Sequence, residues 1–354
     1  MAPSRRMLTG ILLGALMVSG FAGLATLIQS SATQEPGDIF ILGWETEGMP
    51  KGGKPGGGTP TQPPQSIPWG IAKVKADQAW GASTGSAVNV LVADTGIQKD
   101  HPDLAANIKG GKNYACNSPV RCDASKWNDG NGHGTHVSGT VAAAFNTIGV
   151  VGAAHTANLY AAKVLTDAGS GSWAWLAQAI DDAAATRTDA DPGNDIHIIT
   201  MSLGGSGGSS ALAAAVSNAY ANGIVLVAAM GNSGDGDPAT TETSYPAAYP
   251  EVIGVGATDV NDNVASWSSS ASYAEICAPG VSVYSTYKGS SYATLSGTSM
   301  ATPHATGSIA LMLAAFPGSS PAAVRAKLAS TAVNIGAATN SCGAGLVDAL
   351  ALSI

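Results

Sequence analysis

Short apolar runs alternate with stretches of helical pattern over most of the chain, and this alternation constrains the fold more than any other feature. The apolar runs are residues 88–93, 158–164, 196–201, 223–228 and 252–255. The helical stretches are residues 173–186, 210–222 and 321–331. Strands that alternate with helices are typical of a parallel sheet. We therefore predict an α/β fold of three layers, with a mainly parallel central sheet and helices on both faces.

Three polar residues stand at the ends of such elements. Asp94 follows the first apolar run and should lie at the carboxyl end of a buried strand, where open α/β sheets bind ligands. His133 lies between two glycines and precedes a small apolar stretch, so we expect it at the start of a core helix. Ser299 lies in a Gly-Thr-Ser turn before the apolar stretch 305–313, so its N–H should be a free donor at a helix N-terminus.

These side chains together are the ones that a serine hydrolase needs. A serine hydroxyl is a poor nucleophile near neutral pH, so His133 must take its proton. Asp94 must fix the imidazole tautomer and stabilise the imidazolium. The tetrahedral intermediate of acyl transfer needs a second hydrogen-bond donor. We assign that role in the oxyanion hole to Asn232, an amide that follows the apolar run 223–228.

The segments around these residues, together with Ser202-Leu203-Gly204-Gly205 and Tyr245-Pro246, resemble those of the subtilisin family of serine endopeptidases. The order Asp, His, Ser is that of subtilisin and differs from the orders in chymotrypsin and in α/β-hydrolases. The resemblance extends from about residue 65 to residue 349. It implies a subtilisin-like fold and a secreted endopeptidase that hydrolyses proteins through an acyl-enzyme.

Two other functions use the same fold. A transpeptidase or macrocyclase would exclude water from the acyl-enzyme, but nothing in the chain resembles an added lid domain. A catalytically silent binding protein would have lost a residue of the triad or of the oxyanion hole, and all four are present. His136 is a rival base, but the family pattern places the catalytic histidine first in His-Gly-Thr-His. We expect the remaining histidines to be structural or superficial: His101, His155, His197 and His304.

The resemblance also implies how a peptide substrate binds. Two edge segments would accept it as an added extended strand, through backbone hydrogen bonds that do not depend on sequence, which predicts broad specificity. The segments are Gly169, Ser170, Gly171 and Ser202, Leu203, Gly204. The pocket for the residue before the scissile bond would be bordered by Ala229, Gly231 and Ser233. With no acidic residue evident there, we expect a preference for large apolar side chains, unless Glu242 enters the pocket.

A calcium site is implied by matching the family residue by residue. Its ligands would be the side chains of Gln65, Asp103 and Asn146 and the carbonyls of Ala144, Ile148 and Val150. All are oxygen donors, which suit a hard cation. A second site could involve Asp123, Asp129 and Asn131, but for these we favour a solvated loop.

The 354 residues divide into three parts. Residues 1–32 form a signal peptide or signal anchor, because Arg5 and Arg6 precede an uncharged stretch from 7 to 28. Cleavage would follow Ala25 or Ala32, which predicts secretion to the extracellular space or periplasm. An uncleaved anchor on the membrane is the alternative. Residues 33–64 form a flexible Gly/Pro-rich linker or a short processed segment, and residues 65–354 form the peptidase domain.

Maturation is where the resemblance is weakest. Secreted subtilisin relatives usually carry an inhibitory propeptide domain of some seventy residues or more, and residues 33–64 are too few for one. Either folding needs no such domain, or residues 38–44 are a remnant of it.

Charge and cysteine content fit an exported enzyme. The formal net charge of −8 argues against nucleic acid and anionic membranes as partners, so we expect protein or peptide substrates and a monomer. Four cysteines in such a chain suggest two disulfides. Cys116 and Cys122 are close enough to close a small loop, leaving Cys277 with Cys342, yet four cysteines permit three connectivities.

Overall fold

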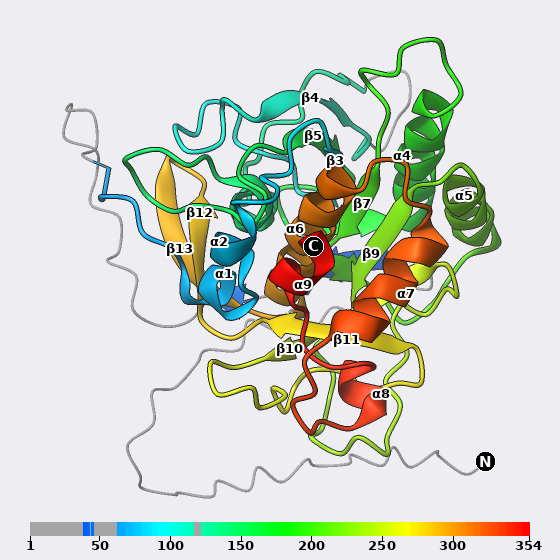
Figure 1. Ribbon diagram of the computed structural model, residues 1–354. Coiled ribbons are helices and arrows are strands. Elements are labelled where there is room, and N and C mark those ends of the chain that lie inside the picture. The colour runs from blue at the N-terminus through cyan, green and yellow to red at the C-terminus, as the bar shows by residue number, and fades with distance from the viewer. Residues whose placement is uncertain (1–37, 43, 46–61, 117–121) are drawn as a thin grey trace, which may run out of the picture.

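The computed structural model describes residues 38–42, 44–45, 62–116 and 122–354. Its centre is a seven-stranded sheet in the order β11-β10-β9-β7-β3-β5-β4, in which every neighbouring pair is parallel (Figure 1). The strands are β3 (Asn89–Asp94), β4 (Ile108–Asn113), β5 (Asn158–Lys163), β7 (Ile198–Met201), β9 (Val225–Ala229), β10 (Val252–Thr258) and β11 (Ala274–Pro279). The predicted parallel sheet is confirmed.

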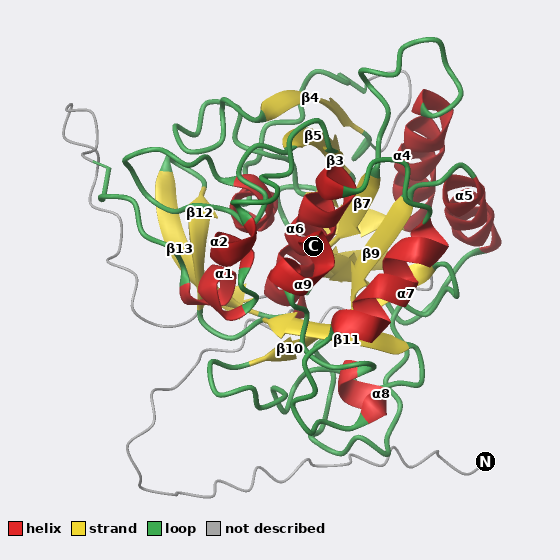
Figure 2. Cartoon of the chain, in the orientation of Figure 1, coloured by secondary structure: helices red, strands yellow, loops and turns green. Residues whose placement is uncertain are grey.

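Helices cover both faces of this sheet, as Figure 2 shows. The strand β3 illustrates why: Val90 and Val92 pack in one core cluster, and Leu91 and Ala93 pack in the other. The first cluster includes residues of α3 (His133–Ala142) and α6 (Thr298–Ala315), and the second includes residues of α4 (Trp173–Thr186) and α5 (Ser210–Ala221). The three-layer α/β fold is therefore confirmed.

Further helices complete the described part of the fold. They are α1 (Trp69–Lys73), α2 (Ala76–Ala79), α7 (Pro321–Thr331), α8 (Thr339–Cys342) and α9 (Ala349–Ser353). The helix α9 and the C-terminus lie over α6 (Figure 1).

Two small antiparallel sheets flank the large one. One has the order β6-β1-β8, from β1 (Asp38–Ile41), β6 (Ser170–Ser172) and β8 (Leu203–Gly204). The other has the order β12-β13-β2, from β2 (Trp44–Glu45), β12 (Val283–Tyr287) and β13 (Ser291–Ser296). Neither sheet was predicted, because their strands are short or carry no apolar run. Both include a strand from the N-terminal region that precedes the large sheet in sequence.

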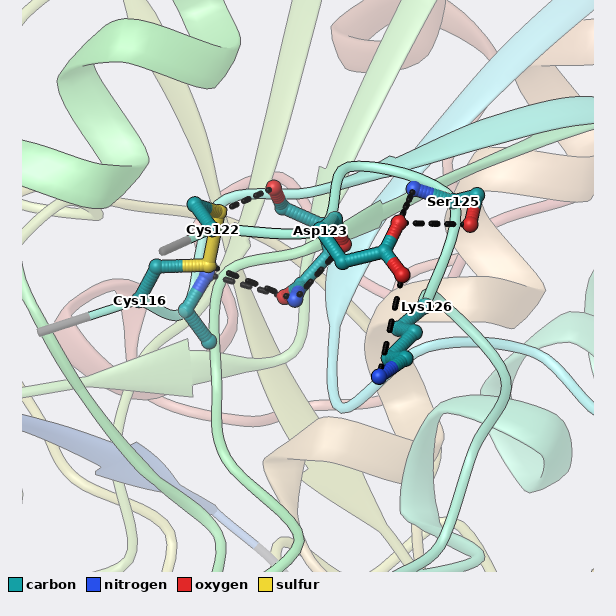
Figure 3. Close-up of a disulfide and its surroundings, with 7 residues drawn as sticks. Cys116, Cys122, Asp123, Ser125 and Lys126 are labelled. Carbon is teal, nitrogen blue, oxygen red and sulfur yellow. Dashed lines mark hydrogen bonds and ion pairs between the residues drawn. A yellow bond between two sulfur atoms is a disulfide. The ribbon is translucent and has the colours of Figure 1, made fainter. Parts of the chain in front are cut away.

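The four cysteines form the two predicted disulfides, and of the three possible connectivities the structure has Cys116 with Cys122 and Cys277 with Cys342. Figure 3 shows the first of them. Beside it, the carboxylate of Asp123 accepts hydrogen bonds from the N–H and the hydroxyl of Ser125, at 3.1 and 2.6 Å. Asp123 is thus held within its own exposed loop.

The predicted signal segment, residues 1–32, lies outside the described residues, as does most of the predicted linker. Within the described ranges, no helix combines the length and the apolar character that crossing a membrane requires.

Candidate active site

Asp94 and His133 meet at the carboxyl edge of the large sheet. Asp94 is the last residue of β3 and is fully buried, and His133 is the first residue of α3. The Nδ1 atom of His133 lies 2.8 Å from Oδ1 and 3.0 Å from Oδ2 of Asp94. The N–H of Thr95 donates to Asp94 Oδ1 at 2.7 Å. The carboxylate therefore holds one ring nitrogen and leaves Nε2 as the outward end of the imidazole.

The close approach of α3 to β3 requires a glycine at position 134. A β-carbon there would lie 2.2 Å from the carbonyl oxygen of Gly96 and 3.1 Å from Cβ of Asp94. The N–H of Gly134 instead donates to Oγ1 of Thr95 at 2.9 Å. Any side chain at this position would push the histidine away from the aspartate.

Asp129 organises the histidine loop, a role that the sequence analysis did not predict. Its buried carboxylate accepts five hydrogen bonds, two of them from the hydroxyls of Thr95 and Thr135 and three from backbone N–H groups of residues 131, 132 and 135. The signal was available, because an aspartate ahead of Gly-Asn-Gly is typical of a side chain that accepts from the backbone of its own turn. Asp129 is therefore buried and not part of a solvated loop, whereas Asp123 is exposed and accepts hydrogen bonds from Ser125.

Ser299 lies in the first turn of α6 and is fully buried. Its hydroxyl donates to the carbonyl of Ser202 at 2.9 Å, and the hydroxyl of Ser202 donates back to the Ser299 carbonyl at 2.8 Å. The second bond has a cause in the sequence. Pro303 has no N–H, so the Ser299 carbonyl lacks its usual helical donor four residues on and is free to accept from Ser202.

Two hydrogen bonds connect Ser299 to Leu42. The N–H of Ser299 donates to the Leu42 carbonyl at 3.1 Å, and the N–H of Leu42 donates to the Ser299 hydroxyl oxygen at 3.0 Å. The expectation that this N–H is free of the helix holds, although the helix begins at Thr298 and not after the turn.

Asn232 follows β9 and faces the same turn of α6. Its Oδ1 atom accepts from the N–H of Thr298 at 2.9 Å and from the Thr298 hydroxyl at 2.8 Å. Since both bonds use the oxygen, the side-chain NH₂ is the end directed away from Thr298. The NH₂ of Asn232 therefore takes no part in holding this turn of α6.

The two histidines of α3 have different surroundings. Within the described part of the chain, Nε2 of His133 is buried with no hydrogen-bond partner. His136 instead places Nε2 3.0 Å from the carbonyl oxygen of Val283 and 3.2 Å from that of Ala293. Burial lowers the pKa of His136 to about 3, so this ring stays neutral at ordinary pH. The two rings therefore differ in what holds them: His133 is held by the carboxylate of Asp94, and His136 by two backbone carbonyls.

The six residues predicted to line the substrate groove lie on either side of β1. Antiparallel pairing joins Ile39 to Gly171 and Phe40 to Ser170 on one side, and Ile41 to Leu203 on the other. The N–H of Ile41 also donates to the carbonyl of Gly169 at 3.2 Å. The two edge segments, Gly169–Gly171 and Ser202–Gly204, are thus spaced to hold one extended strand between them.

Glu242 is engaged in its own loop. Its Oε2 accepts from the N–H of Ser270 at 2.8 Å and its Oε1 from the hydroxyl of Thr240 at 2.6 Å. Both carboxylate oxygens therefore have partners outside the pocket bordered by Ala229, Gly231 and Ser233.

The six predicted calcium ligands also come together. The side-chain NH₂ of Gln65 donates to Ala144 O at 2.8 Å, to Val150 O at 3.2 Å and to Asn146 Oδ1 at 3.3 Å. Asn146 in turn donates to the buried carboxylate of Asp103 at 2.7 Å. The N–H of Ile148 donates to Asn146 Oδ1, which places Ile148 in the same loop. No cluster of three or more His, Cys, Asp or Glu side chains suited to a metal occurs among the described residues, and this set contributes a single carboxylate.

Comparison with known proteins identifies the family. The model of the subtilase family matches residues 85–345. Subtilisin Savinase of Lederbergia lenta is 47% identical over 286 residues, which cover 80% of this chain and 98% of that protein. Subtilisin DY of Bacillus licheniformis is 47% identical over 274 residues, 77% of this chain and 93% of that protein. Subtilisin E of Bacillus subtilis is 44% identical over 273 residues, 77% of this chain and 68% of that protein. The chain therefore belongs to the subtilase family and is a serine endopeptidase.

Proposed function

We propose that Asp94, His133 and Ser299 form the catalytic triad of this endopeptidase and that Asn232 completes its oxyanion hole. The buried Nε2 of His133 takes the proton from the Ser299 hydroxyl as its oxygen attacks the peptide carbonyl. Asp94, held to Nδ1, stabilises the imidazolium that forms. The N–H of Ser299 and the NH₂ of Asn232 stabilise the oxyanion, and His133 then protonates the leaving amine.

The observation that carries this proposal is the 2.8 Å contact between His133 Nδ1 and Asp94, which leaves Nε2 of His133 buried and without a hydrogen-bond partner among the described residues. The test is casein hydrolysis by the chain, together with labelling by a fluorophosphonate that reacts with activated serines. We expect both, with the label on Ser299. A folded chain that neither cuts casein nor takes up the label would contradict the assignment.

We further propose broad specificity with a preference for large apolar residues before the scissile bond. Strand pairing in the groove uses backbone groups, which every peptide offers. The Glu242 carboxylate is held by Ser270 and Thr240, so it does not place a negative charge in the pocket. We also propose that the enzyme is exported and is a monomer. Its chain divides into a signal peptide or anchor at residues 1–32, a linker or processed segment at 33–64 and the peptidase domain at 65–354.

Replacing Asn232 with alanine is expected to lower kcat by about 100- to 1000-fold while KM changes little. That is the loss caused by removing the corresponding donor in subtilisin, because such a donor acts on the transition state more than on the bound substrate. The measurement is steady-state hydrolysis of a chromogenic peptide. Asn334→Ala is the control, since Asn334 is exposed and bonds only within its own turn. Equal kcat values for the two variants would remove Asn232 from the oxyanion hole.

We propose that Gln65, Asp103, Ala144, Asn146, Ile148 and Val150 bind calcium. Three oxygens of this set, from Ala144, Asn146 and Val150, already surround the side-chain NH₂ of Gln65. Rotating the Gln65 amide by half a turn would direct its own oxygen to the same point, as a fourth ligand. Burial raises the pKa of the Asp103 carboxyl, a cost that a bound cation offsets. Calcium would supply stability here and no step of the reaction, because it joins the chain at residue 65 to the loop 144–150.

Chelation is therefore expected to destabilise the fold and leave the catalytic groups in place. A ligand at 100 times its dissociation constant adds about 2.7 kcal/mol to the free energy of unfolding. Thermal unfolding with calcium or with chelator measures this, in a Ser299→Ala background that prevents self-digestion. The variant Asp103→Asn should unfold at one temperature in both conditions. Calcium that stabilised this variant as much as its parent would place the ion elsewhere.

A further inference from the structure

One carboxylate outside the proposed triad joins the substrate edge to the loop before His133. Asp167 lies two residues ahead of the edge segment Gly169–Gly171, which pairs with β1. Its Oδ1 atom accepts a hydrogen bond from the N–H of Gly130 at 3.2 Å. Gly130 belongs to the histidine loop, residues 128–132, which leads into α3 at His133. Asp167 therefore contacts the two segments whose relative position places a bound peptide against the histidine.

The contact between Asp167 and the histidine loop is close and is made at more than one point. A β-carbon on Gly130 would lie 2.4 Å from Asp167 Oδ2, so a side chain there would displace the carboxylate. The side-chain NH₂ of Asn131 donates to the Asp167 carbonyl at 3.0 Å, and Asn131 Oδ1 accepts from the N–H of His133 at 3.2 Å. From another element, Lys288 donates to the Gly130 carbonyl at 3.0 Å. A shift of Asp167 would thus reach the backbone of His133 through one side chain.

Asp167 also pairs with a buried positive charge beside the strand of Asp94. Lys163 ends β5, lies opposite Asp94 in the sheet, and has a side chain that is only 9% exposed. Its Nζ atom donates to the carbonyl of Thr95 at 2.5 Å and to Asp167 Oδ1 at 2.6 Å. The hydrogen bond from Lys163 holds the pKa of the Asp167 carboxyl below its usual value. Asp167 is therefore ionised over the pH range in which a histidine titrates.

We propose that Asp167 is a positioning residue for the proposed triad, on which this inference rests. It fixes the histidine loop to the substrate edge, and it cancels a buried positive charge that would oppose the imidazolium of His133. Lys163 is its partner in the second task.

The charges around His133 determine the direction of the expected effect. Six titratable groups face it from its own loop and helix, from β3 and β5, and from the turns after β5 and β12: Asp94, Asp129, His136, Lys163, Asp167 and Lys288. The carboxylates favour the imidazolium and the two lysines oppose it, while His136 stays neutral at ordinary pH. Removing the Asp167 charge should therefore make the imidazolium form only at a lower pH.

Asp167→Asn tests the charge, because the amide keeps an oxygen for the Gly130 N–H. The acid limb of kcat/KM, which follows protonation of the free enzyme's base, should move to lower pH by on the order of half a unit. Lys163→Met should move the limb to higher pH, by less, since the remaining Asp167 carboxylate is 64% exposed and screened by solvent. The double variant removes both charges and should return the limb close to its wild-type position.

Asp167→Ala tests the positioning, because it removes the acceptor of the Gly130 N–H as well as the charge. We expect the same movement of the acid limb and a kcat about tenfold below that of Asp167→Asn, since a small misplacement of a catalytic group is costly. The measurement is hydrolysis of a chromogenic peptide from acidic to alkaline pH at about 0.1 M salt.

Glu275→Gln is the matched control. Glu275 also pairs with a cation, Arg325 at 2.6 Å, and its side chain is 20% exposed. It lies on β11, which is four strands from β3 in the sheet. At about 4.8 Å a strand the separation is about 19 Å, beyond the screening length of about 10 Å, so the acid limb should stay in place.

Three results would overturn the inference. They are an acid limb that Asp167→Asn leaves in place, a double variant that stays as far from wild type as Asp167→Asn, and equal kcat values for the Asn and Ala variants. Casein hydrolysis and fluorophosphonate labelling of the wild-type enzyme separate this inference from the triad. If both occur while any of the three results is found, only the role of Asp167 fails. If neither occurs in the folded enzyme, the triad assignment fails and the role of Asp167 fails with it.

Discussion

Alanine at position 299 is expected to lower the turnover of casein by about a millionfold, the loss that removal of the nucleophile causes in subtilisin. The variant should still fold, because the Ser299 hydroxyl forms only two hydrogen bonds, one to the Ser202 carbonyl and one from the Leu42 N–H. Residual hydrolysis should remain above the rate in water, since the two oxyanion donors are retained. Initial rates at high enzyme concentration measure the effect.

A matched control for this variant lies in the same helix. Ser308 is buried in α6 and its hydroxyl donates to the His304 carbonyl at 2.8 Å. Ser308→Ala removes an equally buried hydroxyl from the same element and should change turnover by less than about threefold. Similar losses in both variants would mean that damage to α6, and not loss of a nucleophile, explains the first result.

Glutamine at position 133 is expected to cost about as much as the loss of Ser299, again roughly a millionfold in kcat. The amide keeps much of the size of the ring and can still contact Asp94, but it cannot accept the serine proton at neutral pH. Because the members of a triad act as a unit, the double variant with Ser299→Ala should be little worse than either alone. Turnover of a chromogenic peptide by the three variants is the measurement.

His136 provides the contrast, since it lies three residues away on the same helix and was the rival base. Its ring already contacts two backbone carbonyls and its pKa is lowered to about 3 by burial. Glutamine there can donate to the same carbonyls, so His136→Gln should keep kcat within about tenfold of wild type and lose mainly stability. A variant of His136 that lost turnover while His133→Gln kept it would reverse the assignment.

Parts of this fold could be predicted to the residue, and the reason is local. The bounds of α4 and α7 agree with the predicted ranges because a serine caps each N-terminus. Ser172 accepts from the N–H of Trp175, and Ser320 accepts from the N–H of Ala323. The apolar runs of the five predicted strands fixed the centre of the sheet, with ends that differ by at most three residues.

Other parts could not be predicted, because their partners are distant in sequence. The helix α6 begins at Thr298, earlier than its apolar stretch suggested. A proline at position 303 normally argues against a helix there, because it leaves the Ser299 carbonyl without its helical donor. Only the structure shows that the Ser202 hydroxyl donates to that carbonyl instead. The strands β1 and β2 are too short to be recognised alone, and β12 and β13 carry no continuous apolar run. The bonds of Asp129 to its own turn could be predicted locally, but its bond from Thr95, 34 positions earlier, could not.

The groove between β6 and β8 requires a substrate to bind in an extended conformation. It takes at least the five residues from 38 to 42 in fully extended form, with hydrogen bonds on both edges. In a folded substrate protein, these backbone groups are already hydrogen-bonded in helices and sheets. A segment of that protein must therefore unfold locally before it can enter the groove. When opening and closing are fast relative to cutting, the rate of digestion then follows the population of the opened form. For a folded substrate, this enzyme should therefore respond to local stability more than to sequence.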